Sequence, residues 1–265
     1  MEQITLSVSQ LLEIFTQKLN KKFIMGENYF QIKPGDIVLD IGACTGDMSL
    51  YYSWRVGDTG RVYAIEPDKK GNIKKVIYTL KDTKNVHICN LAITNSTGKS
   101  PLYLSRDTSH HSMRKDFLWS QENEERFELM VNTYTLDDFV DYVKIPKIDI
   151  IYMNIEGSEL DVLEGGLKTL TNMSPKIYIA PHELDGINLK EQLIRKLESY
   201  SYKVKEFNGL LYASKHPEDF DIQEHGICQI CEKPIDRHED MRFDGVCWDC
   251  YSVFLQSWMK KIIGL

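Results

Sequence analysis

Four cysteines near the end of the 265-residue chain form two pairs whose spacing is typical of a metal site. Two residues separate Cys228 from Cys231 and Cys247 from Cys250, and fifteen residues lie between the pairs. Four thiolates at this spacing can close a tetrahedral zinc site, which leaves no position for a substrate or a water molecule. The sequence therefore predicts one structural Zn2+ ion that takes no part in a reaction.

A second group of residues that could do chemistry lies in the stretch VLDIGACTGDMSLYY, residues 38–52. Gly42 and Gly46 allow the backbone of a strand-to-helix turn to pass close to a ligand, and the helix that follows begins with free N–H groups. A nicotinamide-binding turn needs glycine at its third and sixth positions, where this chain has cysteine and aspartate. Twenty residues after Gly46, Glu66 can accept both hydroxyls of a ribose. The pattern favours a different nucleoside cofactor.

Alternating apolar strands and amphipathic helices must hold these residues in place. The predicted strands are 37–43, 61–67, 85–93, 147–155 and 176–183, and the predicted helices are 46–56, 69–82, 159–172 and 188–200. Segments 100–105 and 127–134 are expected to pair antiparallel, and residues 202–215 are expected to form a terminal hairpin. This order predicts a doubly wound, mostly parallel α/β sheet that is covered by helices on both faces.

Composition narrows the setting in which the chain works. Apolar residues make up 42% of the chain and charged residues 27%, which is enough for a full α/β core. The net charge of −7 disfavours nucleic acid as a partner, because phosphate contacts depend on Lys and Arg. Residues 1–25 lack the features of a signal peptide, and no apolar run is long enough to cross a membrane. We therefore expect a cytoplasmic protein with reduced thiols and no membrane partner.

Three parts are expected along the chain. Residues 1–30 carry apolar side chains at helical spacing and are predicted to form an N-terminal helical cap, while residues 31–218 hold the α/β sheet. Residues 225–265 form a small zinc-ribbon-like appendage that ends in an amphipathic helix. This helix is expected to pack against the main domain, and self-association through it is the alternative.

Five segments together resemble a known family. The segments VLDIGACTGDMS, YAIEPD, NLAITNSTGKSPLYLS, VNTYTLDDFV and IDIIYMNIEGSELDVLEGG resemble, in order and spacing, the FkbM-type methyltransferases across roughly residues 30–215. The resemblance implies a class I methyltransferase-like fold with a reversed terminal strand. It also implies S-adenosylmethionine as the donor and methyl transfer most often to an oxygen, here a hydroxyl of a small molecule or glycan.

The resemblance also implies where the donor binds. Its methionine end is expected at Asp40, Gly42, Ala43 and Gly46, its ribose at Glu66 beside Pro67, and its adenine near Asn90, Leu91 and Ala92. The chain departs from the family at Tyr152, Asn154 and Ala180, where the family usually has Lys, Asp and Glu. These changes remove charge from the side that is expected to bind the acceptor.

Candidate catalytic residues follow from the need to remove a proton from a hydroxyl acceptor. His110, His111 and His182 are candidate bases, because imidazole titrates near neutral pH, although a histidine is often only a hydrogen-bonded structural residue. Asn154 is expected to orient a substrate, since a neutral amide is a poor base. Glu156 and Glu159 have two interpretations, namely a catalytic role or a stabilising role at the start of the following helix.

Two classes of function remain open from the sequence. The first is an O-methyltransferase with a zinc-stabilised appendage. The second is a binding protein, in which a weakened methyltransferase-like domain and a zinc ribbon recognise a partner, with nucleic acid as one candidate.

Overall fold

The computed structural model describes residues 30, 32–115, 127–182, 189–207 and 209–220. The chain divides into two compact units, and the larger one, Ile32–Glu218, carries every strand and α-helix described below. The predicted N-terminal cap, the four paired cysteines and the C-terminal helix lie outside the described residues.

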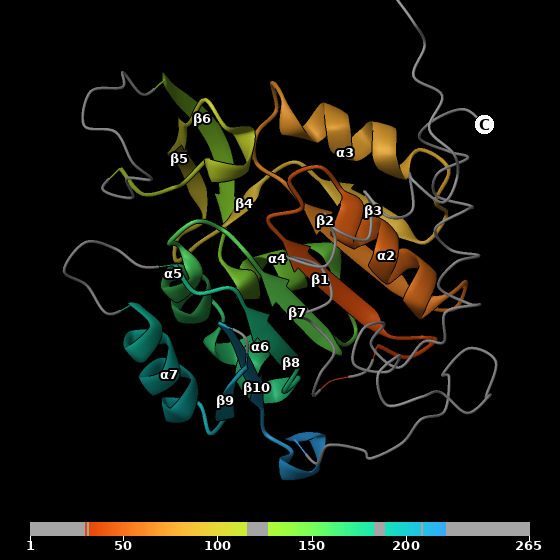
Figure 1. Ribbon diagram of the computed structural model, residues 1–265, viewed down its shortest axis with the longest axis vertical. Helices are drawn as coiled ribbons and strands as arrows, with labels where there is room; N and C mark the ends of the chain where they lie inside the picture. Colours follow the sequence, from red (N-terminus) through yellow and green to blue (C-terminus); the bar gives the residue numbers. More distant parts are fainter. Residues whose placement is uncertain (1–29, 31, 116–126, 183–188, 208, 221–265) are drawn as a thin grey trace, which may run out of the picture. The chain divides into compact units, whose positions relative to one another are not determined.

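Seven strands form the main sheet in the order β3-β2-β1-β7-β8-β10-β9 (Figure 1). They are β1 (Ile37–Ile41), β2 (Arg61–Ile65), β3 (Val86–Cys89), β7 (Ile150–Met153), β8 (Lys176–Ile179), β9 (Lys203–Phe207) and β10 (Leu210–Ser214). The strands from β3 to β8 in this order are all parallel to one another. Strand β10 is antiparallel to both of its neighbours, β8 and β9. The predicted class I methyltransferase-like α/β fold, with its mostly parallel sheet and reversed terminal strand, is confirmed.

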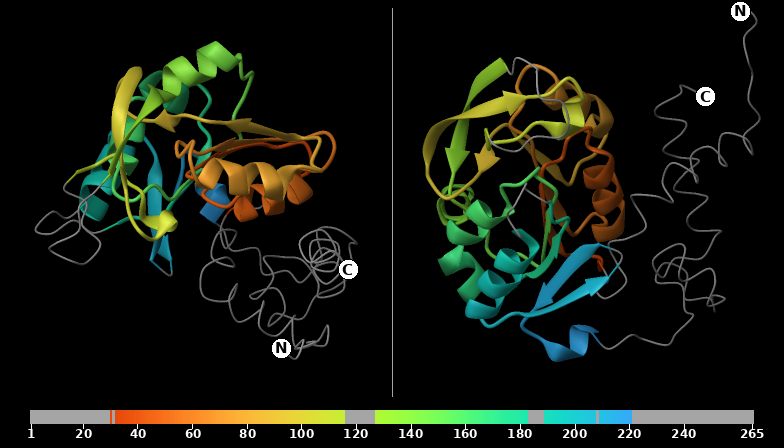
Figure 2. Two further views of the ribbon diagram at one scale, coloured as in Figure 1. Left: turned by 90° about the horizontal axis from the view of Figure 1, so that it is seen from above. Right: turned by 60° about the vertical axis from the view of Figure 1, so that its left-hand side comes forward.

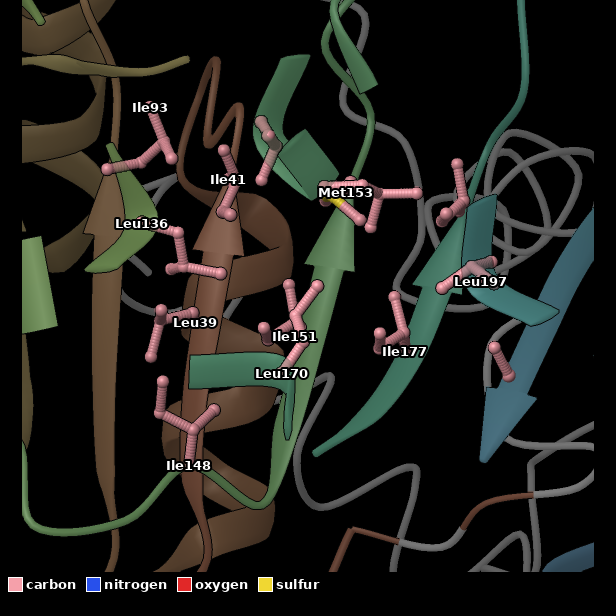
Figure 3. Close-up of a cluster of buried hydrophobic side chains, with 14 of the residues drawn as sticks. Leu39, Ile41, Ile93, Leu136, Ile148, Ile151, Met153, Leu170, Ile177 and Leu197 are labelled. Carbon is pink, nitrogen blue, oxygen red and sulfur yellow. The ribbon is translucent and has the colours of Figure 1, made fainter. Parts of the chain in front are cut away.

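Helices cover both faces of this sheet (Figure 2). One face carries α2 (Asp47–Val56) and α3 (Asn72–Leu80), and the other carries α4 (Leu136–Val143), α5 (Glu159–Glu164), α6 (Leu167–Asn172) and α7 (Leu189–Ser199). Figure 3 shows the core on the second face, where Leu39 and Ile151 of the sheet meet Leu136, Leu170 and Leu197 of the helices. The central strands are apolar on both sides because both faces are buried.

A second, smaller sheet lies beside the first and consists of β4 (Ala92–Ile93), β5 (Gly98–Leu104) and β6 (Phe127–Tyr134). The predicted antiparallel pairing of residues 100–105 with 127–134 is confirmed by β5 and β6. The single strand predicted over 85–93 is wrong, because β3 and β4 belong to different sheets. Between them, Asn90 donates its side-chain amide to the Glu66 carbonyl oxygen at 2.8 Å, which holds the chain in a bend.

The predicted helix over 159–172 is also interrupted, since α5 ends before Gly165 and α6 begins after Gly166. Both glycines are tightly packed: a Cβ at Gly165 would lie 2.4 Å from the Thr94 carbonyl oxygen, and one at Gly166 would lie 2.8 Å from the Leu136 side chain. Glycine costs helix stability, and here it allows two neighbouring segments to approach the backbone closely.

Within the part of the chain that the structure describes, no helix is both long enough and apolar enough to cross a membrane.

Candidate active-site cleft

An open cleft lies where β1, β2 and β7 end, and it encloses about 540 Å3 of empty space that is partly open to solvent. Ligands of doubly wound sheets bind at this position, beyond the carboxyl ends of the strands. The apolar part of its wall consists of Ile41, Ile65, Pro67, Ala92, Ile93, Leu102, Met113 and Ile155. The remaining lining residues are Gly42, Cys44, Glu66, Asn72, Thr108, Ser109, His111, Asn154, Glu156 and Ser158.

Gly42 lies on the cleft wall, in the loop between β1 and α2, where only glycine fits. Its φ is +94°, and a Cβ there would lie 2.4 Å from the Asn154 carbonyl oxygen. Gly46 has a φ of +85° and is absent from the wall, because it packs against α3, where a Cβ would lie 3.3 Å from the Val76 Cα. The two glycines therefore serve the close packing of this loop against β7 and α3.

The amide groups of the same loop form hydrogen bonds inside the protein. The N–H groups of Gly42 and Ala43 donate to the Ile65 carbonyl oxygen at 3.0 and 2.9 Å. The N–H group of Cys44 donates to Glu66 Oε2 at 2.9 Å. These three bonds fix the loop to the end of β2. The polar group available to a ligand in this part of the cleft is therefore the Glu66 carboxylate.

Glu66 is 4% exposed and accepts a second hydrogen bond, from the Asp68 N–H group at 2.8 Å. Burial raises the pKa of Glu66 to about 7, against the lowering effect of the two backbone hydrogen bonds. A carboxylate has about four acceptor positions, so roughly two remain for hydroxyl donors. Hydroxyl donors at these two positions would favour the ionised form of Glu66.

Asp40 and Ala43 lie behind the cleft wall and are absent from its lining. Asp40 is fully buried and accepts a hydrogen bond from the Ser49 hydroxyl of α2, while its Oδ1 has no partner among the described residues. Burial raises the pKa of Asp40 to about 7. Tyr152 stands opposite Asp40 in the β1–β7 pairing, so no positive charge from that position neutralises the acid.

The predicted adenine segment reaches the cleft only in part. Ala92 lines the wall together with Ile93. Asn90 is exposed, and its amide holds the carbonyl oxygens of Glu66 and Pro67 at 2.8 and 3.2 Å. Leu91 is half-buried and packs against the core. Asn90 and Leu91 therefore do not line the cleft, but they support the residues that do.

Glu156, Glu159 and His182 form a hydrogen-bonded group, of which only Glu156 belongs to the lining of the cleft. His182 Nδ1 lies 2.7 Å from Glu159 Oε1, and His182 Nε2 lies 3.2 Å from Glu156 Oε1. Glu156 lines the cleft, whereas the Glu159 side chain has no exposed surface. The second carboxylate oxygen of each glutamate has no hydrogen-bond partner among the described residues.

The protonation state of His182 follows from this geometry. Burial alone would lower the pKa of His182, but its hydrogen bonds to Glu156 and Glu159 and their negative charges raise it to about 9. His182 is therefore an imidazolium at neutral pH, and it pairs with two carboxylates. Glu159 holds this ring in place in addition to starting α5.

His111 and His110 differ in their relation to the cleft. His111 lines it, and both ring nitrogens are engaged: Nδ1 accepts the Ser105 N–H group at 3.0 Å, and Nε2 lies 3.6 Å from Asp68 Oδ2. Burial lowers the pKa of His111, so its ring is neutral at neutral pH. His110 is absent from the lining and lies 3.7 Å from Asp107.

Two further residues were missed by the sequence interpretation. Asp68 accepts the N–H groups of Lys70, Gly71 and Asn72 at 2.8 to 3.0 Å, and so it fixes the turn before α3. Its signal was an aspartate placed just before a helical segment. Ser158 lines the cleft between Gly157 and Glu159, and nothing in a single sequence marks a serine at that position.

Comparisons with known proteins identify the family of the chain. A sequence model described as a methyltransferase FkbM domain matches residues 40–204. The protein named 2-O-methyltransferase NoeI from Sinorhizobium fredii (strain NBRC 101917 / NGR234) is 24% identical over 185 residues, which are 64% of this chain and 75% of that protein.

Two solved structures are also similar. The methyltransferase FkbM from Methylobacillus flagellatus KT is 20% identical with a TM-score of 0.43, and the match covers 69% of this chain but only 44% of that chain. A SAM-dependent methyltransferase from Aquifex aeolicus is 19% identical with a TM-score of 0.40, and the match covers 76% of this chain and 89% of that one.

Proposed function

The chain belongs to the FkbM methyltransferase family, and we propose that it transfers a methyl group from S-adenosylmethionine to a hydroxyl oxygen of a small molecule or glycan. The observation that carries this proposal is that one cleft is lined by two carboxylates, the buried Glu66 and Glu156. The first suits a ribose and the second suits an acceptor hydroxyl. The name of the similar protein NoeI, a 2-O-methyltransferase, supports an oxygen as the acceptor atom.

The residues of the cleft fit the donor. Glu66 has acceptor positions left for two ribose hydroxyls. Pro67, Ala92 and Ile93 offer an apolar wall for a flat base.

When it is bound, S-adenosylmethionine supplies a methyl group on a positively charged sulfur. The remaining task of the protein is to align the acceptor hydroxyl and to receive its proton. Glu156 lines the cleft, and its Oε2 has no hydrogen-bond partner among the residues that the structure describes, so it is the residue we assign to this proton. Asn154 lines the same wall and is assigned to orienting the bound molecules.

His182 acts through Glu156 and is a positioning residue. Its ring is held by Glu159 at 2.7 Å and contacts Glu156 at 3.2 Å, so it fixes the direction of the Glu156 carboxylate. An imidazolium between two carboxylates leaves one net negative charge on the group, and this charge favours the loss of a proton from the acceptor. His182 itself cannot accept that proton at neutral pH, because its pKa is raised to about 9.

The test is methyl transfer from labelled S-adenosylmethionine to hydroxylated acceptors, together with calorimetry of the demethylated product, S-adenosylhomocysteine. We expect Glu156→Gln to lose transfer while it still binds S-adenosylhomocysteine, because Glu66 and the apolar wall are unchanged. Failure of the wild-type protein to bind either nucleoside would refute the proposed donor. Full activity in Glu156→Gln would refute the assigned proton acceptor.

We also propose that Cys228, Cys231, Cys247 and Cys250 bind one structural zinc ion, on the basis of their spacing alone. These residues lie outside the described part of the chain. Inside it, no group of three or more His, Cys, Asp or Glu side chains is arranged to hold a metal ion.

A further inference from the structure

Ser158 immediately precedes helix α5, yet its hydroxyl does not cap this helix. A serine in this position usually accepts a hydrogen bond from the second or third N–H group of the helix. Here the side chain makes no capping bond, and its Oγ is buried without a hydrogen-bond partner among the described residues. The residue is 1% exposed and belongs to the cleft wall.

Glu156 shows the same combination two residues earlier. It is 7% exposed, it lines the cleft, and its Oε2 has no partner in the described part of the chain. Buried polar atoms are normally paired, so two unpaired ones in a single wall are suited to bind a polar ligand.

The backbone between these two residues is strained and fixed. Glu156 and Gly157 have φ values of 54° and 95°, which are in the left-handed region that a glutamate rarely adopts. The Ser112 hydroxyl donates to the Glu156 carbonyl oxygen at 2.7 Å and holds this conformation. Strained, over-determined backbone of this kind is concentrated at binding and catalytic sites. The turn places Glu156 and Ser158 on one wall of the cleft.

We infer that Glu156 and Ser158 form a paired subsite for two neighbouring hydroxyl groups of the acceptor, and that the hydroxyl at Glu156 is the one methylated. This inference rests on the proposed function and adds the class of acceptor, a vicinal diol such as a pyranose ring provides. A carboxylate oxygen only accepts, so it takes the proton of the reacting hydroxyl, whereas a serine hydroxyl can donate to or accept from the adjacent one. An acceptor with a single hydroxyl leaves Ser158 buried and unpaired, and so it is bound less well.

The inference is tested with methyl pyranosides and with matched derivatives in which the hydroxyl beside the methylated position is replaced by hydrogen. For the wild-type protein we expect kcat/KM to be about tenfold higher for the diol than for its deoxy partner, the effect of about one hydrogen bond. In Ser158→Ala this ratio should fall close to one. The melting temperature of Ser158→Ala should stay the same or rise, since the variant removes a buried hydroxyl that has no hydrogen-bond partner within the described part of the chain.

Ser109→Ala is the matched control. Ser109 lines the same cleft, but its hydroxyl already donates to Asp107 Oδ1 at 2.7 Å, so this variant should keep the preference for the diol. An unchanged preference in Ser158→Ala, or an equal loss in both variants, would overturn the inference. Loss of S-adenosylhomocysteine binding in Ser158→Ala would also overturn it, because the hydroxyl would then serve the donor.

The same experiment separates the inference from the proposed function. If the wild-type protein does not bind S-adenosylhomocysteine, the proposed function itself fails. If it binds this nucleoside and methylates other hydroxyl compounds but no pyranoside, the proposed function stands and the paired subsite is refuted.

Discussion

The charge of His182 makes the stability of the protein depend on pH in a way that can be measured. The pKa of His182 is about 9 in the folded protein, against an ordinary value of 6.5. Because the folded value is the higher one, the stabilisation is fully present below pH 6.5 and is lost as the pH rises through 9. This difference corresponds to about 3 kcal/mol of unfolding free energy, most of it lost between about pH 7 and pH 10.

Urea unfolding of the wild-type protein and of His182→Gln across this pH range measures the effect. The unfolding free energy of the wild-type protein should fall by about 2 to 3 kcal/mol more than that of His182→Gln between about pH 7 and pH 10. Asp40 and Glu66, whose pKa values burial raises to about 7, also lose stabilisation as the pH rises, but they do so in both proteins and mainly at the lower end of the range.

His216→Gln is the control, because the His216 side chain is 60% exposed and contacts only Glu218 among the ion pairs of the described residues. It should retain the wild-type slope. A direct NMR titration of the wild-type His182 ring needs no variant. A ring that titrates at or below pH 6.5 would refute the assignment of an imidazolium between two carboxylates, and with it the role of His182 in holding Glu156.

Three further results are expected. Glu66→Ala should weaken the binding of S-adenosylhomocysteine by about 1 to 3 kcal/mol in calorimetry, because two ribose hydroxyls lose a charged acceptor; unchanged affinity would remove Glu66 from the site. Gly42→Ala should lower the melting temperature far more than Gly57→Ala, since both glycines have positive φ but only the Cβ at position 42 would meet backbone, 2.4 Å from Asn154; equal losses would show that the contact can relax. Elemental analysis should find about one zinc per chain, and chelation should leave S-adenosylhomocysteine binding intact, because Glu66 belongs to the separately packed sheet; a chain without metal, or loss of binding on chelation, would contradict this division.

The periodicity of the sequence predicted most of the strands and helices, since the central strands are buried on both faces and the helices on one, but helix α4 was not among the predicted elements. Two wrong boundaries depend on contacts between residues that are distant in sequence. Residues 85–93 lack any turn signal except Asn90, and the bend there depends on a long-range bond from Asn90 to Glu66. The interruption of residues 159–172 depends on how closely Thr94 and Leu136 approach Gly165 and Gly166, which no local pattern encodes.

The candidate site could be predicted where a residue type and a spacing determine the chemistry, as with Glu66 at the end of the second strand. It could not be predicted where contacts across the fold decide the role of a residue. His182 and Glu159 are 23 positions apart in sequence and meet because the adjacent strands β7 and β8 end side by side. The same type of contact, from Ser105 and Asp68, engages both ring nitrogens of His111.

The described residues other than glycine that adopt a positive φ support this location of the site. Lys144, Ser174 and Ser201 have φ values between 52° and 66° and follow the ends of helices, where a left-handed residue commonly ends the helix. Cys44 and Glu156, with φ values of 51° and 54°, have no such explanation. They lie in the loops after β1 and β7, the two central strands of the cleft, and both line it. The strain is therefore concentrated in the two loops that would hold the donor and the acceptor, and a protein that used this sheet only as a scaffold would have no reason to retain it there.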